Sequence, residues 1–171
     1  FMASAPLTSP SDQMTVMLER VYNWVLGQIS LGDQIKAFVG SPVEPLFFDQ
    51  YGRRIGIIAG VPINEIPGAS HAVLGDKHAF DLPDTLTYTF AAAGTDSGTM
   101  LLNFLVPLEN SVVRAVGYHE VPVSDGSAIS VQLSVENVDW TLLNTGQPPT
   151  QPDHLEDIEI HASYLPTLQS E

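Results

Sequence analysis

The clearest periodic pattern of apolar positions lies near the N-terminus. Apolar side chains recur there at intervals of three and four residues, at Met14, Met17, Leu18, Val21, Trp24 and Val25. This spacing is that of one face of a helix, and Ser9 and Pro10 suit its first turn. We therefore predict a disordered or tag-derived stretch over residues 1–10 and an N-terminal helical segment over 11–40.

From residue 41 onward the pattern changes to short apolar runs that alternate with polar residues. Such runs, bounded by turn residues, predict strands over 46–50, 54–66, 85–93, 99–107, 111–123, 128–143 and 157–164. Residues 67–84 and 144–153 carry many Gly, Pro and polar residues and are predicted to be long loops. The fold class is all-β, with one antiparallel barrel or sandwich domain over 41–171.

The stretch "FFDQYGRRIGIIAG", residues 47–60, places two glycines in an apolar run. Glycine weakens a strand, so it marks a bulge, a sharp bend, or a close approach of another group to the backbone. We interpret Gly56 and Gly60 as bends that let a small antiparallel sheet close. This favours an antiparallel β-barrel of approximately eight strands with an N-terminal amphipathic helix.

Charge and composition exclude several classes of partner. Six Lys and Arg against twenty Asp and Glu give a net charge of −14, which repels nucleic acid and anionic membranes. No apolar run is long enough to cross a membrane. The absence of cysteine excludes disulfides and thiolate catalysis and agrees with a cytoplasmic protein.

The chain lacks the spacings that mark common catalytic centres. Its five histidines show no metal-binding motif, so no metal site is predicted; they are His71, His78, His119, His154 and His161. His71 and His78 are read as solvated side chains of the 67–84 loop. No G-x-S-x-G turn and no glycine-rich phosphate loop occurs, which disfavours hydrolases and nucleotide cofactors. No cofactor is predicted.

Polar and aromatic residues on the predicted strands are the remaining candidates for a site. Alternation in 111–123 puts Arg114, Tyr118 and Glu120 on one face. Asn103 interrupts an apolar strand, and Gln132 shares a face with Trp140. Each of these residues suits a binding pocket with a few polar anchors, although the alternative for the aromatic ones is an ordinary core.

The segment "FFDQYGRRIGIIAGVPI" resembles the allene oxide cyclase-like β-barrel family at Asp49, Gly52, Ile55, Gly56 and Gly60. The resemblance implies a barrel with room for one small ligand. Bacterial members of that family include spirotetronate and spirotetramate cyclases, which are Diels-Alderases that close a polyketide by intramolecular [4+2] cycloaddition. Some of them carry an N-terminal helical lid. The resemblance therefore implies a cofactor-independent cyclase in natural-product and antibiotic biosynthesis, with an apolar substrate and a homo-oligomeric assembly.

Such a reaction needs a shaped cavity rather than a nucleophile or a metal, because freezing a flexible chain in a reactive geometry lowers its barrier. The expected catalytic residues are Tyr118 and Gln132 as hydrogen-bond donors, with Arg114 and Glu120 as a paired anchor. The expected substrate-binding residues are Met14, Met17, Val21, Trp24, Tyr88, Phe90, Asn103 and Trp140.

Three alternatives stay open at this stage. The first is a non-catalytic, lipocalin-like carrier of an apolar small molecule, which would share the cavity with a cyclase. The second is a structural β-sandwich whose interior is filled by the aromatic residues. The third concerns the helix, which either acts as a lid or packs permanently on the outside of the β domain.

Overall fold

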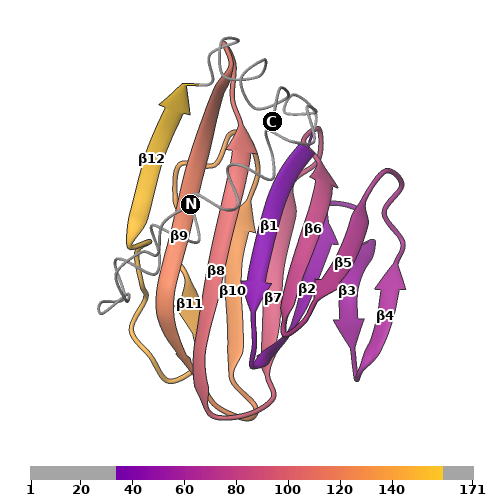
Figure 1. Cartoon of the computed structure of the whole chain (residues 1–171), viewed down its shortest axis with the longest axis vertical. Helices are drawn as coiled ribbons and strands as arrows, with labels where there is room; N and C mark the ends of the chain where they lie inside the picture. The colour runs from indigo at the N-terminus through magenta and orange to yellow at the C-terminus, as the bar shows by residue number, and fades with distance from the viewer. Residues whose placement is uncertain (1–33, 160–171) are drawn as a thin grey trace, which may run out of the picture. The chain divides into compact units, whose positions relative to one another are not determined.

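The computed structural model describes residues 34–159, which form an all-β unit (Figure 1). Twelve strands lie in this range, arranged as two six-stranded sheets in which every paired strand is antiparallel. The prediction of an all-β, antiparallel fold is confirmed. Residues 1–10 and the predicted helix with Met14, Met17, Val21 and Trp24 lie outside the described residues.

Each sheet is built from strands that are distant in sequence. Sheet A contains, in spatial order, β12 (His154–Glu159), β9 (Val112–Val123), β8 (Gly98–Pro107), β1 (Gln34–Gly40), β6 (Lys77–Pro83) and β5 (Ser70–Leu74). Sheet B contains β11 (Leu143–Asn144), β10 (Ala128–Leu133), β7 (Tyr88–Gly94), β2 (Val43–Asp49), β3 (Arg54–Ile58) and β4 (Val61–Asn64). The chain passes repeatedly from one sheet to the other.

The predicted eight-stranded barrel is wrong, because neither sheet closes on itself. Among the described residues, sheet A ends at β12 and β5, and sheet B ends at β11 and β4. Buried aromatic side chains from both sheets pack between them. The ring centroids of Phe47 and Phe80 are 4.8 Å apart, and those of Phe90 and Phe104 are 6.0 Å apart. Two sheets packed face to face over such a core form a sandwich.

The two glycines of the 47–60 stretch have different roles. Gly56 pairs with Leu46 and has φ +143°, and a Cβ atom at this position would lie 2.1 Å from the carbonyl oxygen of Pro45. It therefore marks a close approach of two backbones rather than a barrel bend. Gly60, with Ala59, forms a two-residue turn in which both residues have positive φ, the geometry of a tight hairpin. The predicted strand 54–66 is thus the β3–β4 hairpin.

Three further element predictions are wrong. Most of the predicted loop 67–84 is the β5–β6 hairpin, and the end of the predicted helical segment 11–40 is β1, one of the two central strands of sheet A. The predicted strand 128–143 ends at Leu133 with β10, and of its remainder only Leu143 belongs to a strand, β11. In β1 the residues Ile35, Ala37 and Val39 alternate toward the core. Alternation of this kind is typical of a strand. The glycines and prolines around β1 made this short pattern hard to recognise in the sequence.

Asp49, one of the residues that carry the family resemblance, closes the turn between β2 and β3. Its buried carboxylate accepts hydrogen bonds from the backbone N–H groups of Tyr51 and Arg53, both at 2.9 Å, and from Arg53 Nε at 2.6 Å. Burial raises the pKa of Asp49, but the hydrogen bonds from Arg53 and Tyr51 outweigh it and hold this pKa below its usual value. Asp49 is therefore a structural residue of the hairpin.

Candidate functional site

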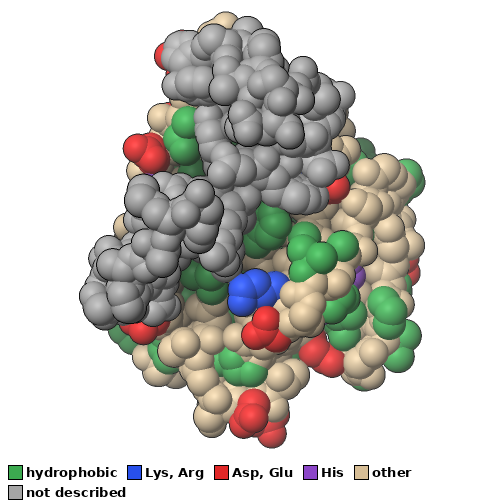
Figure 2. All heavy atoms as spheres, in the orientation of Figure 1, with side chains coloured by type: hydrophobic (Ala, Val, Ile, Leu, Met, Phe, Trp, Pro, Cys, Tyr) green, Lys and Arg blue, Asp and Glu red, His purple; other side chains and the backbone are tan. Residues whose placement is uncertain are grey.

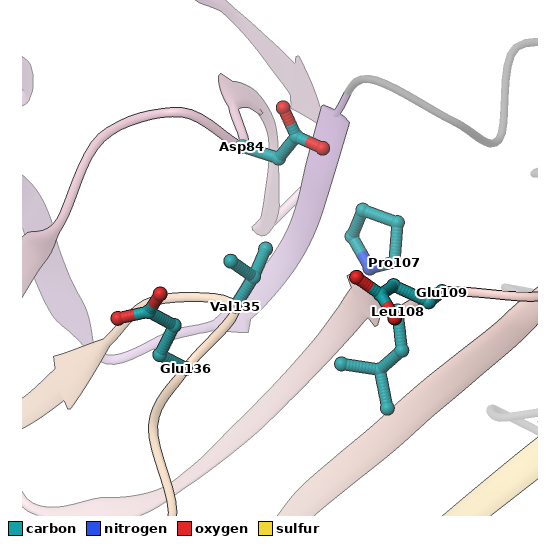
Figure 3. Close-up of a pocket in the computed structure, with 6 residues that line it drawn as sticks. All are labelled: Asp84, Pro107, Leu108, Glu109, Val135 and Glu136. Atoms are coloured by element: carbon teal, nitrogen blue, oxygen red, sulfur yellow. The ribbon is translucent and has the colours of Figure 1, made fainter.

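A recess of about 450 Å³ opens at one end of the sandwich. Figure 3 shows the three chain segments that face one another across it. Its lining consists of Asp84, Pro107, Leu108, Glu109, Val135 and Glu136. The volume falls within the range of about 300–1,000 Å³ that is usual for small-molecule sites.

The topology of the two sheets brings these segments together. β6 and β8 both pair antiparallel with β1, so they run in the same direction. Their C-terminal residues therefore lie at the same end of the strands of sheet A. Asp84 directly follows β6, and Pro107 is the last residue of β8. Val135 and Glu136 follow the end of β10 in sheet B. The recess is therefore built where strands of both sheets end.

Hydrogen bonds hold two of the three segments in place. Val135 and Glu136 are the central residues of a turn closed by the N–H of Asn137 and the carbonyl of Ser134, at 3.2 Å. The side-chain amide of Asn137 also donates to the carbonyl of Gln132. In the β8–β9 turn the N–H of Leu108 donates to the carbonyl of Val112 at 2.7 Å. These two parts of the lining are thus ordered before any ligand binds.

The residue types around the recess define what it can accept. Leu108 and Val135 pack against the hydrophobic core and form an apolar floor, together with Pro107. Three carboxylates surround this floor, and no Lys or Arg belongs to the lining. On the face seen in Figure 2, acidic side chains appear at several separate places, whereas Lys and Arg appear at one. The recess suits a molecule with an apolar body and a positive charge.

The aromatic residues predicted to bind substrate lie in the core. Phe90, Tyr88, Tyr118 and Trp140 are each at most 3% exposed. The hydroxyl of Tyr118 donates to the carbonyl oxygen of Trp140, and that of Tyr88 donates to Pro83 at 2.6 Å. Burial is the main cause that raises the pKa of both tyrosines. Both hydroxyls therefore serve the fold, as buried tyrosines usually do.

The other predicted site residues are dispersed over the sandwich. Arg114 forms a bidentate ion pair with Asp157 of β12, at 2.7 and 3.0 Å, rather than with Glu120. Glu120 is exposed and has φ +51°, which interrupts the alternation of β9. Gln132 is an exposed residue of β10, between the buried Val131 and Leu133. The four predicted catalytic residues are not brought together.

Asn103 is fully buried but does not face the aromatic core. It lies on β8 between Leu102 and Phe104, whose side chains belong to the core, so alternation directs it to the opposite face of sheet A. Among residues 34–159, its amide nitrogen and oxygen have no hydrogen-bond partner. The recess and Asn103 are therefore separate features.

The sequence contains a weak signal for the recess. The segments Leu108–Glu109–Asn110 and Val135–Glu136–Asn137 share the order apolar, Glu, Asn, and each follows the end of a strand. The first segment predicts a turn, whereas the second falls within the predicted strand 128–143. Nothing in the sequence indicates that two turns 27 positions apart meet at one end of a sandwich.

Comparisons with known proteins give no match: no family model, no curated protein and no solved structure is similar to this chain. Within residues 34–159, no three His, Asp or Glu side chains are placed to share a metal ion. No helix of that range is long and apolar enough to span a membrane.

Proposed function

We propose that this protein binds a small molecule in the recess at the end of the sandwich and releases it unchanged. The ligand has an apolar body and a positively charged group, such as an amine. The observation that carries the proposal is the lining, in which an apolar floor of Pro107, Leu108 and Val135 is surrounded by three carboxylates. This is the carrier alternative, with a ligand class that the recess defines.

The two parts of the lining have different effects on binding. A solvent-exposed ion pair contributes only about 0.2–1 kcal/mol, whereas burial of apolar surface contributes about 25 cal/mol per Å². Contact with the floor and pairing with the carboxylates therefore both contribute to the affinity. The carboxylates of Asp84, Glu109 and Glu136 supply selectivity, because they attract a cation and repel an anion of the same shape.

A cyclase of a polyketide-like substrate, as the family resemblance implies, is a second proposal. The same apolar floor favours it, since a [4+2] ring closure needs a shaped apolar wall and no cofactor. The space between the sheets is filled by Phe47, Phe80, Phe90 and Phe104. The substrate would therefore bind at the recess and not between the sheets.

The first experiment compares three compounds that share one aromatic ring system and carry an amine, a hydroxyl or a carboxylate. We expect calorimetry to show that the amine binds most tightly and the carboxylate most weakly. Val135→Trp, which fills the recess, should abolish binding. Val138→Trp changes the same residue type in the same loop at a position that is 88% exposed, and it should leave binding unchanged. Equal affinity of both variants, or no preference for the amine, would contradict the proposal.

A turnover assay separates the two proposals. The protein is incubated with a linear polyketide that carries a diene and a dienophile, and the products are compared with those formed in buffer alone. Recovery of the compound unchanged agrees with a carrier. Accelerated formation of one stereoisomer that Val135→Trp abolishes would establish the cyclase instead.

A further inference from the structure

His71 and His78 lie side by side on the β5–β6 hairpin. The strands are joined by the two-residue turn Gly75–Asp76, and the register pairs His71 with Phe80 and Val73 with His78. The two histidines are therefore diagonal neighbours on one face of the sheet. His71 Nε2 lies 2.9 Å from His78 Nδ1. The prediction that they are separate, solvated loop residues is wrong.

The core holds one of the two rings in position. The ring of His71 is stacked on that of Phe80, with a centroid distance of 4.2 Å and an angle of 5° between the planes. Phe80 is 1% exposed and contacts Phe47 from sheet B. The plane of the His71 ring is thus set by a buried residue, which reduces the entropy lost when the ring binds a ligand.

Both histidines favour the form that binds metals. Burial lowers the pKa of His71 and of His78, and the proximity of His78 lowers the pKa of His71 further. Neutral imidazole, which has a lone pair on one nitrogen, is the metal-binding form.

The separation of the two nitrogens matches that of neighbouring metal ligands. With metal–nitrogen distances of about 2.0–2.1 Å, two imidazole nitrogens at the right angle of a tetragonal copper or nickel site are about 2.9 Å apart, whereas the tetrahedral angle of zinc separates them by about 3.3 Å. In the present state one nitrogen donates its proton to the other, as their distance of 2.9 Å indicates. A metal ion would take the place of the proton between the two nitrogens. That proton would move to the other nitrogen of the ring that carries it. Each ring would then direct the lone pair of its free nitrogen toward the ion.

We propose that His71 and His78 form a two-histidine site for a divalent transition-metal ion. Imidazole ligands suit copper, nickel and zinc, and copper binds most tightly in this series. Within residues 34–159 no third His, Asp or Glu completes the site, so water fills the other positions of the ion. The site would bind metal reversibly and leave exchangeable positions for a second ligand.

The test is a calorimetric titration of Cu²⁺ alone into the full chain at neutral pH. We expect one saturable site, and loss of affinity by about tenfold or more in His71→Ala and in His78→Ala. The matched control is His154→Ala, since His154 is half-buried and its Nε2 atom lies 3.4 Å from the carboxylate of Glu156. This variant should bind as the unaltered protein does.

A spectroscopic measurement keeps the proposal falsifiable if a variant does not fold. Electron paramagnetic resonance of the unaltered protein with Cu²⁺ should show two imidazole nitrogens bound to the ion. A spectrum without two nitrogen ligands would overturn the proposal. Binding that is unchanged in a folded His71→Ala/His78→Ala double variant would overturn it as well.

Discussion

Replacement of Gly56 by alanine should destabilise this protein much more than a glycine substitution in a nearby turn. The added Cβ would lie 2.1 Å from the carbonyl oxygen of Pro45 and 2.8 Å from Cα of Leu46, whereas ordinary contacts begin near 3.4 Å. Both neighbouring atoms belong to the backbone of β2, so no side-chain rotation relieves the clash. The β2 and β3 strands would have to separate, which weakens the ladder between them.

The size of the effect follows from two contributions. An alanine at φ +143° lies in a sparsely populated region that costs about 1–3 kcal/mol. Forcing an extra methyl group into a closely packed position costs about 1–3 kcal/mol more. The free energy of unfolding should therefore fall by about 2–6 kcal/mol, a large part of the roughly 5–15 kcal/mol that stabilises a typical domain.

Gly60→Ala is the matched control. Gly60 has φ +78°, but a Cβ there meets nothing within 4 Å, so this variant should lose only about 1–2 kcal/mol. Urea denaturation followed by circular dichroism measures both variants, and Gly56→Ala should have the lower midpoint, by about 1 M or more at the middle of the two ranges. Equal stability of the two variants would refute the close approach of β2 and β3.

Three further substitutions test individual contacts. Asp49→Asn should lose about 1.5–3 kcal/mol at neutral pH, because the carboxylate accepts charged and backbone hydrogen bonds. The pKa of Asp49 in the folded protein lies below its usual value, so its contribution to the free energy of unfolding is present above about pH 4 and is lost as pH falls further. Urea curves at several pH values should therefore show that the stabilities of the two proteins converge in acid. Tyr118→Phe should lower the free energy of unfolding by about 1–3 kcal/mol, because the carbonyl of Trp140 loses its buried donor. Ligand binding measured by calorimetry should not change. Abolished binding in a folded variant would mean that Tyr118 belongs to the binding site. Arg114→Ala breaks an exposed pair with Asp157 and should change stability by at most about 1 kcal/mol in the same urea assay; a larger loss would mean that the pair anchors β12.

The sequence predicted the fold class because most strands follow the two-residue alternation of a half-buried sheet. The predicted strands 99–107 and 111–123 differ from β8 and β9 by one residue at one end. The sequence left a sandwich open but favoured a barrel, because glycine in a strand indicates a local departure from regular structure without saying which kind. At Gly56 the departure is a contact between neighbouring backbones, and only the coordinates of both strands show it.

The site was harder to predict because its residues belong to turns whose meeting depends on the topology. Tyr118 and Trp140 look like binding residues in the sequence, yet the hydroxyl of Tyr118 and the carbonyl of Trp140 satisfy each other inside the core. Glu109 looks like an ordinary turn residue and Glu136 like a residue of the predicted strand 128–143, yet both line the recess. The alternation rule also failed at Glu120, where a positive φ interrupts the strand.

The most direct test of the proposed function is a map of amide chemical-shift changes in the labelled protein on addition of the aromatic amine. We expect the largest changes to be confined to Asp84, to residues 108 and 109, and to residues 135 and 136, and to saturate. Val135→Trp should remove these changes, and Val138→Trp should retain them. Changes centred on the core residues Phe90 and Tyr118, or the absence of saturable changes, would contradict the claim that the recess is the binding site.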